Sequence, residues 1–154
     1  MRIAGLTLLG LLVIGAAGYL SFCPCGPVPG AWLFGDTHEG EVTDWSFIND
    51  REAVPLCQLQ ITSWRPHSIN LNCMSSNEEL FVSCSNCEGK SWSENALNHP
   101  DGKVRAGGVV YPVRLTRVTD AASLDVIWSA RLAKINREAA PRPDHWWSFR
   151  LVQR

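Results

Sequence analysis

The central part of the chain is a series of short segments in which apolar and polar residues alternate, and this pattern constrains the fold more than any other feature. Residues 56–62 (LCQLQIT) and 68–73 (SINLNC) are the clearest examples. Alternation with a period of two is typical of β-strands that bury one face. A polar turn over residues 75–79 leads to a third expected strand, 80–84, and a closing strand is expected at 147–152. The sequence therefore predicts a mainly antiparallel β domain.

Gly107 and Gly108 mark the clearest hairpin of the chain. They separate two further expected strands, 103–106 and 109–118. Glycine tolerates the positive φ angles that two-residue hairpin turns require, so a tight turn is expected here. Strands this numerous tend to twist and close on themselves, which favours a barrel.

Two helices are expected within this domain. Ser91 followed by Glu94 is typical of a capping box and predicts a short helix that ends before His99. Helical spacing of apolar residues after Asp120 predicts a second helix from about 121 to 135. The apolar positions are Leu124, Ile127, Trp128, Leu132 and Ile135.

The N-terminal segment is apolar and carries no charge from Ile3 to Phe22. A run of about 20 such residues is long enough to cross the hydrocarbon core of a bilayer, so residues 1–22 are predicted to be a transmembrane anchor. A cleaved signal peptide is the alternative, because residues 16–18 (AAG) are small enough for a cleavage site. Arg2 near the start places the N-terminus in the cytoplasm and the folded part outside it, on the periplasmic side.

Residues 23–35 are rich in Pro and Gly and are expected to form a stalk, which leaves residues 36–154 as a single domain. The composition is 45% hydrophobic with a formal net charge of −1, so neither a disordered chain nor a nucleic-acid-binding protein is indicated. Basic residues near the C-terminus alternate with apolar ones and predict a solvated face. These residues include Arg114, Arg117, Arg131, Arg137, Arg142, Arg150 and Arg154.

Residues 81–92 (FVSCSNCEGKSW) are the strongest candidate for a functional segment, because they form a strand, a polar turn and the start of a helix. A helix N-terminus with hydroxyls and Lys90 close by suits a phosphate group. The same residues also fit a simpler interpretation, in which Ser91 only caps the helix and Lys90 is solvated.

The chain has six cysteines, and an oxidising compartment would allow them to pair. Cys84 and Cys87 form a Cys-x-x-Cys motif, for which a structural disulfide is favoured over a redox pair or half of a metal site. No metal site is predicted, because the remaining Cys and His residues do not have the spacing of a compact zinc module. Cys57 and Cys73 fall in expected strands and are interpreted as buried apolar residues.

A succession of short motifs in the second half of the chain resembles a known family. The motifs are residues 89–92 (GKSW), 95–100 (NALNHP), 104–108 (VRAGG), 111–114 (YPVR) and 118–120 (VTD). In this order they resemble the split β-barrel of the pyridoxamine 5′-phosphate oxidase-like superfamily, especially its flavin- and deazaflavin-dependent nitroreductase-like branch. The resemblance implies an antiparallel split β-barrel with two helices, preceded here by the transmembrane helix.

The resemblance also implies a cofactor, FMN or a deazaflavin, held by its phosphate between the third strand and the short helix. Carried over by position, the residues that would hold it are Ser83, Ser85, Asn86, Lys90 and Ser91, with Trp92 packed behind them. Arg65 and His67, in the turn between the first two strands, are further candidates for contact with the phosphate or the ring.

Relatives of this kind usually dimerise, so a homodimer is expected as well. The predicted function is a membrane-anchored flavin-binding protein, an oxidoreductase on a small substrate. The alternative is a non-catalytic extracytoplasmic binding or assembly module that keeps the barrel and its structural Cys-x-x-Cys.

Overall fold

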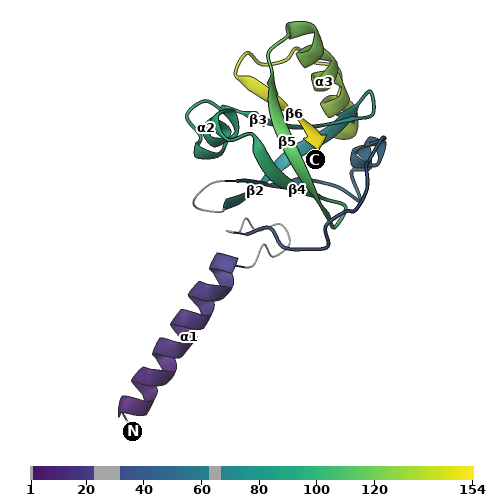
Figure 1. Cartoon of the computed structure of the whole chain (residues 1–154). Coiled ribbons are helices and arrows are strands. Elements are labelled where there is room, and N and C mark those ends of the chain that lie inside the picture. The colour runs from purple at the N-terminus through teal and green to yellow at the C-terminus, as the bar shows by residue number, and fades with distance from the viewer. Residues whose placement is uncertain (1, 23–31, 63–66) are drawn as a thin grey trace.

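Six antiparallel strands form a closed barrel in the order β1-β2-β3-β6-β5-β4 (Figure 1). The computed structural model describes residues 2–22, 32–62 and 67–154. The strands are β1 (Cys57–Ile61), β2 (His67–Ser76), β3 (Glu79–Ser85), β4 (Asp101–Ala106), β5 (Val109–Val118) and β6 (Trp146–Gln153). The helices are α1 (Arg2–Phe22), the short 3-10 helix η1 (Ser46–Asn49), α2 (Ser91–Asn98) and α3 (Ala121–Lys134). The predicted antiparallel barrel is therefore confirmed.

The alternation seen in the sequence separates the inside of the barrel from its outside. In β3, Leu80 and Val82 point into the main core, whereas Phe81 belongs to a second cluster beneath α3. The same division holds in β6, where Phe149 fills the interior and Trp146 lies under α3. Both faces of these two strands are buried where α3 covers them.

The barrel closes where β1 pairs with β4. Gly102 of β4 lies opposite Ile61 in this pairing. A Cβ atom added at Gly102 would lie 2.5 Å from the carbonyl oxygen of Gln60, well inside any permitted contact. This close approach of two backbones is a position that only glycine can occupy.

Both tight hairpins use two residues with positive φ. Gly107 and Gly108 have φ angles of 57° and 87°, so the predicted glycine turn between β4 and β5 is confirmed. Between β2 and β3 the turn is Asn77-Glu78, with φ angles of 51° and 66°. β2 therefore continues to Ser76, through residues that had been expected to lie in the turn. A glutamate is an unfavourable residue for this left-handed conformation.

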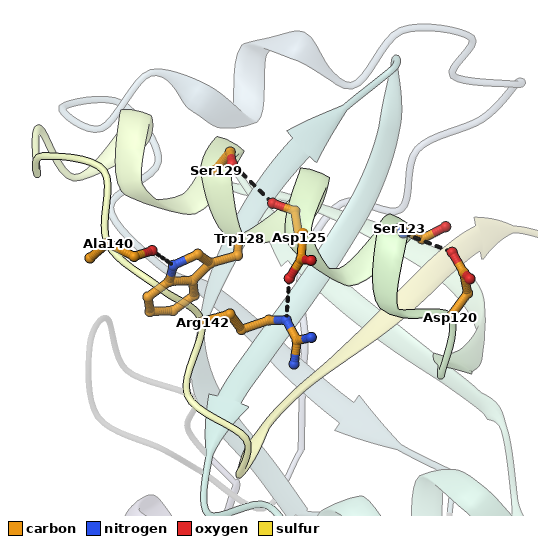
Figure 2. Close-up of polar contacts among 7 residues, drawn as sticks. All are labelled: Asp120, Ser123, Asp125, Trp128, Ser129, Ala140 and Arg142. Carbon is orange, nitrogen blue, oxygen red and sulfur yellow. Dashed lines mark hydrogen bonds and ion pairs between the residues drawn. The ribbon is translucent and has the colours of Figure 1, made fainter.

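The helix predicted from about 121 to 135 is α3, and its N-terminal end and its outer side are held by polar contacts (Figure 2). Asp120 caps the helix by accepting a hydrogen bond from the Ser123 N–H at 2.8 Å. The following loop is held against the helix by an ion pair of Arg142 with Asp125 at 2.9 Å. Trp128 Nε1 also donates to a carbonyl of that loop at 2.7 Å.

Residues before β1 pack across the barrel. Leu33, in the expected stalk, is buried, and Thr37 forms an isolated bridge with Val110 of β5. Residues 40–45, here called the strap, are attached at both ends. At one end, the Gln153 side chain accepts a hydrogen bond from the Val42 N–H at 2.8 Å and donates one to the Gly40 carbonyl at 2.6 Å. At the other end, the Trp45 N–H donates to the backbone carbonyl of Glu78 at 3.1 Å.

The predicted membrane anchor corresponds to α1. Within the part of the chain that the structure describes, no helix is both long and apolar enough to span a membrane. The anchor is therefore not confirmed, and the orientation of the domain stays a prediction. Residues 23–31, which include most of the expected stalk together with Cys23 and Cys25, lie outside the described residues.

A disulfide joins Cys57 of β1 to Cys73 of β2, with the two Cα atoms 5.7 Å apart. Both cysteines are buried, as expected, and they are also paired, which the sequence left open because pairing depends on a register that it does not state. Lys134, at the end of α3, lies beside this bond. Its Nζ donates to the Cys73 carbonyl at 2.8 Å, and the residue is only 8% exposed.

Replacing Glu78 by Gly should raise the free energy of unfolding by about 1 kcal/mol, because glycine adopts the left-handed conformation without steric cost. Urea denaturation of the two proteins measures the difference. Glu78→Ala is the matched control, because it removes the carboxylate but keeps the unfavourable φ. If Glu78→Ala were stabilised as much as Glu78→Gly, charge rather than backbone conformation would be the cause.

The free energy of unfolding should increase as the pH rises above neutrality, because the buried ammonium group of Lys134 loses its proton. Burial lowers the pKa of its ammonium group to about 8, an effect that nearby Asp50 partly opposes. Between this value and the ordinary pKa of 10.5, the unfolded chain holds a proton that the folded chain has lost, so stability increases with pH.

We expect a gain of about 1 kcal/mol in the free energy of unfolding between pH 8 and about 9.5, measured by denaturant titration. Burial raises the pKa of Tyr111 above 10.0, which acts in the opposite direction only at higher pH. The Lys134→Met variant should lose this dependence. An unchanged pH profile in that variant would contradict the assignment.

Candidate functional site

The turn between β3 and α2 gathers several of the predicted cofactor-binding residues. β3 ends at Ser85, and two left-handed residues, Asn86 (φ 52°) and Gly89 (φ 73°), bring the chain round to α2. Lys90 closes the turn, because its Nζ donates to the Ser85 carbonyl at 3.0 Å. Residues 85–91 are called the β3–α2 turn below.

A disulfide between Cys84 and Cys87 spans the first part of this turn, with Cα atoms 5.7 Å apart. Cys87 is fully buried, whereas residues 85 and 86 between the two cysteines are exposed. The disulfide therefore fixes the backbone that presents Ser85 and Asn86. Within the described ranges, no group of His, Cys, Asp or Glu residues is suited to hold a metal ion.

The start of α2 differs from the expected capping box. The N-cap residue is Lys90, whose side chain makes no capping hydrogen bond. Instead, the buried Ser93 hydroxyl donates to the carbonyl groups of Lys90 and Cys87. Glu94 accepts from the Gly89 N–H at 3.3 Å. Ser91 is free of the capping role and is exposed at the first position of the helix.

The predicted site residues lie in different environments. Ser85, Asn86, Lys90 and Ser91 are exposed together on the β3–α2 turn. Trp92 is half-buried behind them, with its ring 5.5 Å from that of Phe149.

The other predicted residues are placed differently. Ser83 is 1% exposed, and its hydroxyl has no hydrogen-bond partner among the residues the structure covers. His67 is exposed at the start of β2, whereas Arg65 lies outside the described residues.

The electrostatics of the turn are mixed. Lys90 is exposed and, apart from its bond to a backbone carbonyl, is available to an anion. Glu88 and Glu94 lie within the same few residues and are also exposed. The N–H groups of the first turn of α2 and the Ser91 hydroxyl favour an anion, while the two carboxylates oppose it.

Arg117 and Trp147 were missed by the sequence analysis. The Arg117 guanidinium carbon lies 3.5 Å from the centre of the Trp147 ring. The prediction that this arginine belongs to a solvated face was wrong, because its Nε atom is buried. Alternation along β5 could have signalled this, since Val113, Leu115 and Arg117 fall on one face of the strand.

A cleft of about 720 Å³ lies beneath the strap, at the opposite end of β3 and β6 from the β3–α2 turn. The ion pair of Arg150 with Glu79, at 2.6 Å, also lines it. This volume is in the range of sites for small molecules. Among the predicted cofactor-binding residues that the structure describes, none lines this cleft.

The strand order, with one helix between β3 and β4 and another before β6, defines a split β-barrel. No protein-family model matches the sequence, and no curated protein matches it. Solved structures do share the fold, at low sequence identity.

One such structure is a pyridoxamine 5′-phosphate oxidase candidate from Listeria innocua. Its TM-score is 0.55 at 11% identity, over 70% of this chain and 90% of that chain. A candidate 5-nitroimidazole antibiotic resistance protein from Bacteroides thetaiotaomicron has a TM-score of 0.54 at 9% identity, over 79% of this chain and 92% of that chain. A NimC/NimA family protein from Clostridium acetobutylicum has a TM-score of 0.52 at 7% identity, over 69% of this chain and 78% of that chain. The predicted resemblance to the pyridoxamine 5′-phosphate oxidase-like split barrel is therefore confirmed at the level of the fold.

Replacing each of two serines of this region by Ala should affect the free energy of unfolding differently. Ser83→Ala should leave the free energy of unfolding unchanged or slightly higher, because it removes a buried hydroxyl that has no partner in the described structure. Ser93→Ala should lower the free energy of unfolding by about 1 kcal/mol, because the buried hydrogen bonds of the Ser93 hydroxyl to the Cys87 and Lys90 carbonyls are lost. Thermal or urea denaturation compares the variants. A large loss of stability in Ser83→Ala would mean that its hydroxyl makes a bond in solution.

Proposed function

We propose that this protein binds a flavin-type cofactor, FMN or a deazaflavin, and acts as an oxidoreductase on a small substrate. The observation that carries the proposal is the β3–α2 turn, which presents an ammonium group and hydroxyls at a helix N-terminus within a split barrel. The structural neighbours, which include a pyridoxamine 5′-phosphate oxidase candidate, support the same conclusion by their fold.

The residues of the turn fit a phosphate ester. Lys90 would supply the positive charge, and Ser85 and Ser91 would donate hydrogen bonds from their hydroxyls. The first N–H groups of α2 would add the favourable end of the helix dipole. Because Ser83 is buried, it would support the strand rather than contact the phosphate.

A bound flavin would supply hydride or electron transfer, and the protein would orient it and limit its contact with water. Trp92 would provide a rigid wall behind the phosphate, because its ring is already packed on Phe149. His67, exposed at the start of β2, would approach the ligand from that strand. The homodimer expected from the resemblance stays a prediction.

A second candidate function is a binding or assembly module without catalysis. The observation that favours it is the pair of carboxylates, Glu88 and Glu94, beside the single ammonium of Lys90. Their charges reduce the attraction of the turn for a dianion. A cofactor site that had lost its function would tolerate such residues.

FMN added to the purified full-length chain should give a saturable change in the flavin absorption spectrum, and riboflavin, which lacks the phosphate, should bind more weakly. Lys90→Ala should weaken FMN binding about tenfold, because a charge-assisted hydrogen bond is lost. Lys103→Ala is the matched control, since Lys103 is an exposed lysine of β4 outside the turn. Glu94→Gln should tighten binding.

A protein that gives no spectral change with FMN or a deazaflavin would overturn the proposal and favour the non-catalytic module. Equal binding by Lys90→Ala and Lys103→Ala would place the phosphate elsewhere.

A further inference from the structure

The two disulfides in the described part of the chain differ in how far solvent can reach them. Cys57 and Cys73 join two paired strands in the core and are 0% and 1% exposed. The Cys84–Cys87 bond lies at the end of β3, where Cys84 keeps 8% of its surface exposed and residues 85 and 86 are both exposed. Exposed disulfides are more readily reduced by external thiols than buried ones. Of these two bonds, Cys84–Cys87 is therefore the one that a reductant can reach.

The two bonds also differ in the length of chain that they close. Cys57 and Cys73 are 16 positions apart in the sequence, whereas Cys84 and Cys87 are 3 apart. A disulfide stabilises a fold mainly by restricting the unfolded chain, and this effect decreases as the closed loop becomes shorter. Reduction of Cys84–Cys87 therefore removes less stability than reduction of Cys57–Cys73, so the barrel can stay folded without it.

Contacts that do not involve sulfur hold both cysteines in place. Cys84 lies in β3, opposite Trp147 of β6. The Cys87 carbonyl accepts hydrogen bonds from the Ser93 hydroxyl and, at 3.1 Å, from the Lys90 N–H. These contacts do not depend on the disulfide. They keep the two thiols of the reduced protein close together, so the bond can form again.

The segment between the two cysteines is held less firmly. Asn86 has a φ angle of 52°, in the left-handed region that is unfavourable for residues with a side chain. Besides the disulfide on either side of it, the Asn86 N–H donates to the His145 carbonyl at 3.2 Å. Once the disulfide is reduced, this segment can leave the arrangement in which Ser85, Asn86 and Lys90 are exposed together.

The charges around the bond favour its exchange with a thiol. The Lys90 ammonium group lies 3.0 Å from the carbonyl oxygen of Ser85, the residue after Cys84, and α2 begins directly after Lys90. A nearby cation and a helix N-terminus both stabilise a thiolate, which is the leaving group when a disulfide is reduced. Glu88, exposed in the same turn, partly offsets this effect.

We propose that the Cys84–Cys87 disulfide is a reversible redox switch of the β3–α2 turn, and that its reductant is a protein dithiol. A thiolate of the dithiol attacks the Cys84 sulfur, so that a mixed disulfide forms, the Cys84–Cys87 bond breaks and Cys87 leaves as a thiolate that takes up a proton. The second thiolate of the dithiol then attacks its own mixed-disulfide sulfur and releases Cys84, which is also protonated. Two electrons and two protons pass to the cysteine pair, and the dithiol is oxidised to a disulfide.

The exchange reaction itself requires no cofactor. Its effect on cofactor binding rests on the proposed function, because reduction releases the segment that would hold the phosphate. Reduction is therefore expected to weaken the binding of FMN.

The test equilibrates the full-length chain with mixtures of reduced and oxidised dithiothreitol, which serve as the dithiol probe. Free thiols are trapped by alkylation and located by peptide mass spectrometry, which also separates them from Cys23 and Cys25. Hydrogen exchange of the backbone amides is measured on the oxidised and the reduced protein.

We expect Cys84 and Cys87 to be alkylated together, at a ratio of reduced to oxidised dithiothreitol at least about tenfold lower than Cys57 and Cys73 require. Transfer to oxidised glutathione should restore the bond. The amides of residues 85–90 should exchange faster in the reduced protein, whereas those in the middle of β3 should not change.

The Cys84→Ser/Cys87→Ser variant reproduces the reduced state without a reductant, which could itself reduce a flavin. It should bind FMN about fivefold more weakly than the oxidised wild type, because binding must then order the turn. Cys57→Ser/Cys73→Ser is the matched control, and it should lose more of the free energy of unfolding, because it opens the longer loop. Hydrogen exchange of the wild type decides the matter even if a variant folds poorly.

Reduction of both disulfides at the same ratio would overturn the switch, as would loss of the fold on reduction of Cys84–Cys87 or unchanged hydrogen exchange in residues 85–90. Equal FMN affinity of the oxidised wild type and a folded Cys84→Ser/Cys87→Ser variant would overturn its control of the cofactor. The two proposals fail separately. Selective reduction in a protein that binds no FMN would remove the flavin function and keep the switch. Binding of FMN by a protein whose Cys84–Cys87 bond resists reduction would do the reverse.

Discussion

The structure depends on the pairing of β1 with β4, because this contact converts a six-stranded sheet into a closed barrel. Closure removes the exposed strand edges on which sheets aggregate. It requires the backbone of β4 to approach the carbonyl group of Gln60 so closely that position 102 cannot carry a side chain. The Cys57–Cys73 disulfide lies between β1 and β2, next to this seam. The interior filled by Leu80, Val82 and Phe149 exists only because the seam closes.

Local patterns in the sequence were sufficient to predict most of the barrel. Alternation identified the strands, the glycine pair identified one hairpin, and the apolar spacing after Asp120 identified α3. These features depend on residues close together in the chain, which is why they could be read from it. The turn at Asn77-Glu78 was placed less well, since a glutamate does not normally indicate a left-handed residue.

Contacts between distant residues could not be predicted in the same way. The Cys57–Cys73 pairing depends on the register of β1 and β2, and the strap depends on Gln153, more than 100 positions away in the sequence. The candidate site shows the same limit. Sequence analysis gathered Ser85, Asn86, Lys90 and Ser91 correctly into one turn, but it also included Ser83, which the sheet buries. It missed Arg117, because only the tertiary structure sets its guanidinium on Trp147.

The place of β6 in the sheet has a consequence for the synthesis of the protein. β6 is the last strand of the chain, yet it lies between β3 and β5 and pairs with both. Until its residues have left the ribosome, β3 and β5 have no neighbour on those sides, and the strap has no Gln153 to hold it. The β1–β2–β3 and β4–β5 hairpins can form early, but the barrel as a whole cannot close until β6 has been added. During that interval the nascent chain exposes two unpaired strand edges, which are the kind of edge on which strands of another chain can pair.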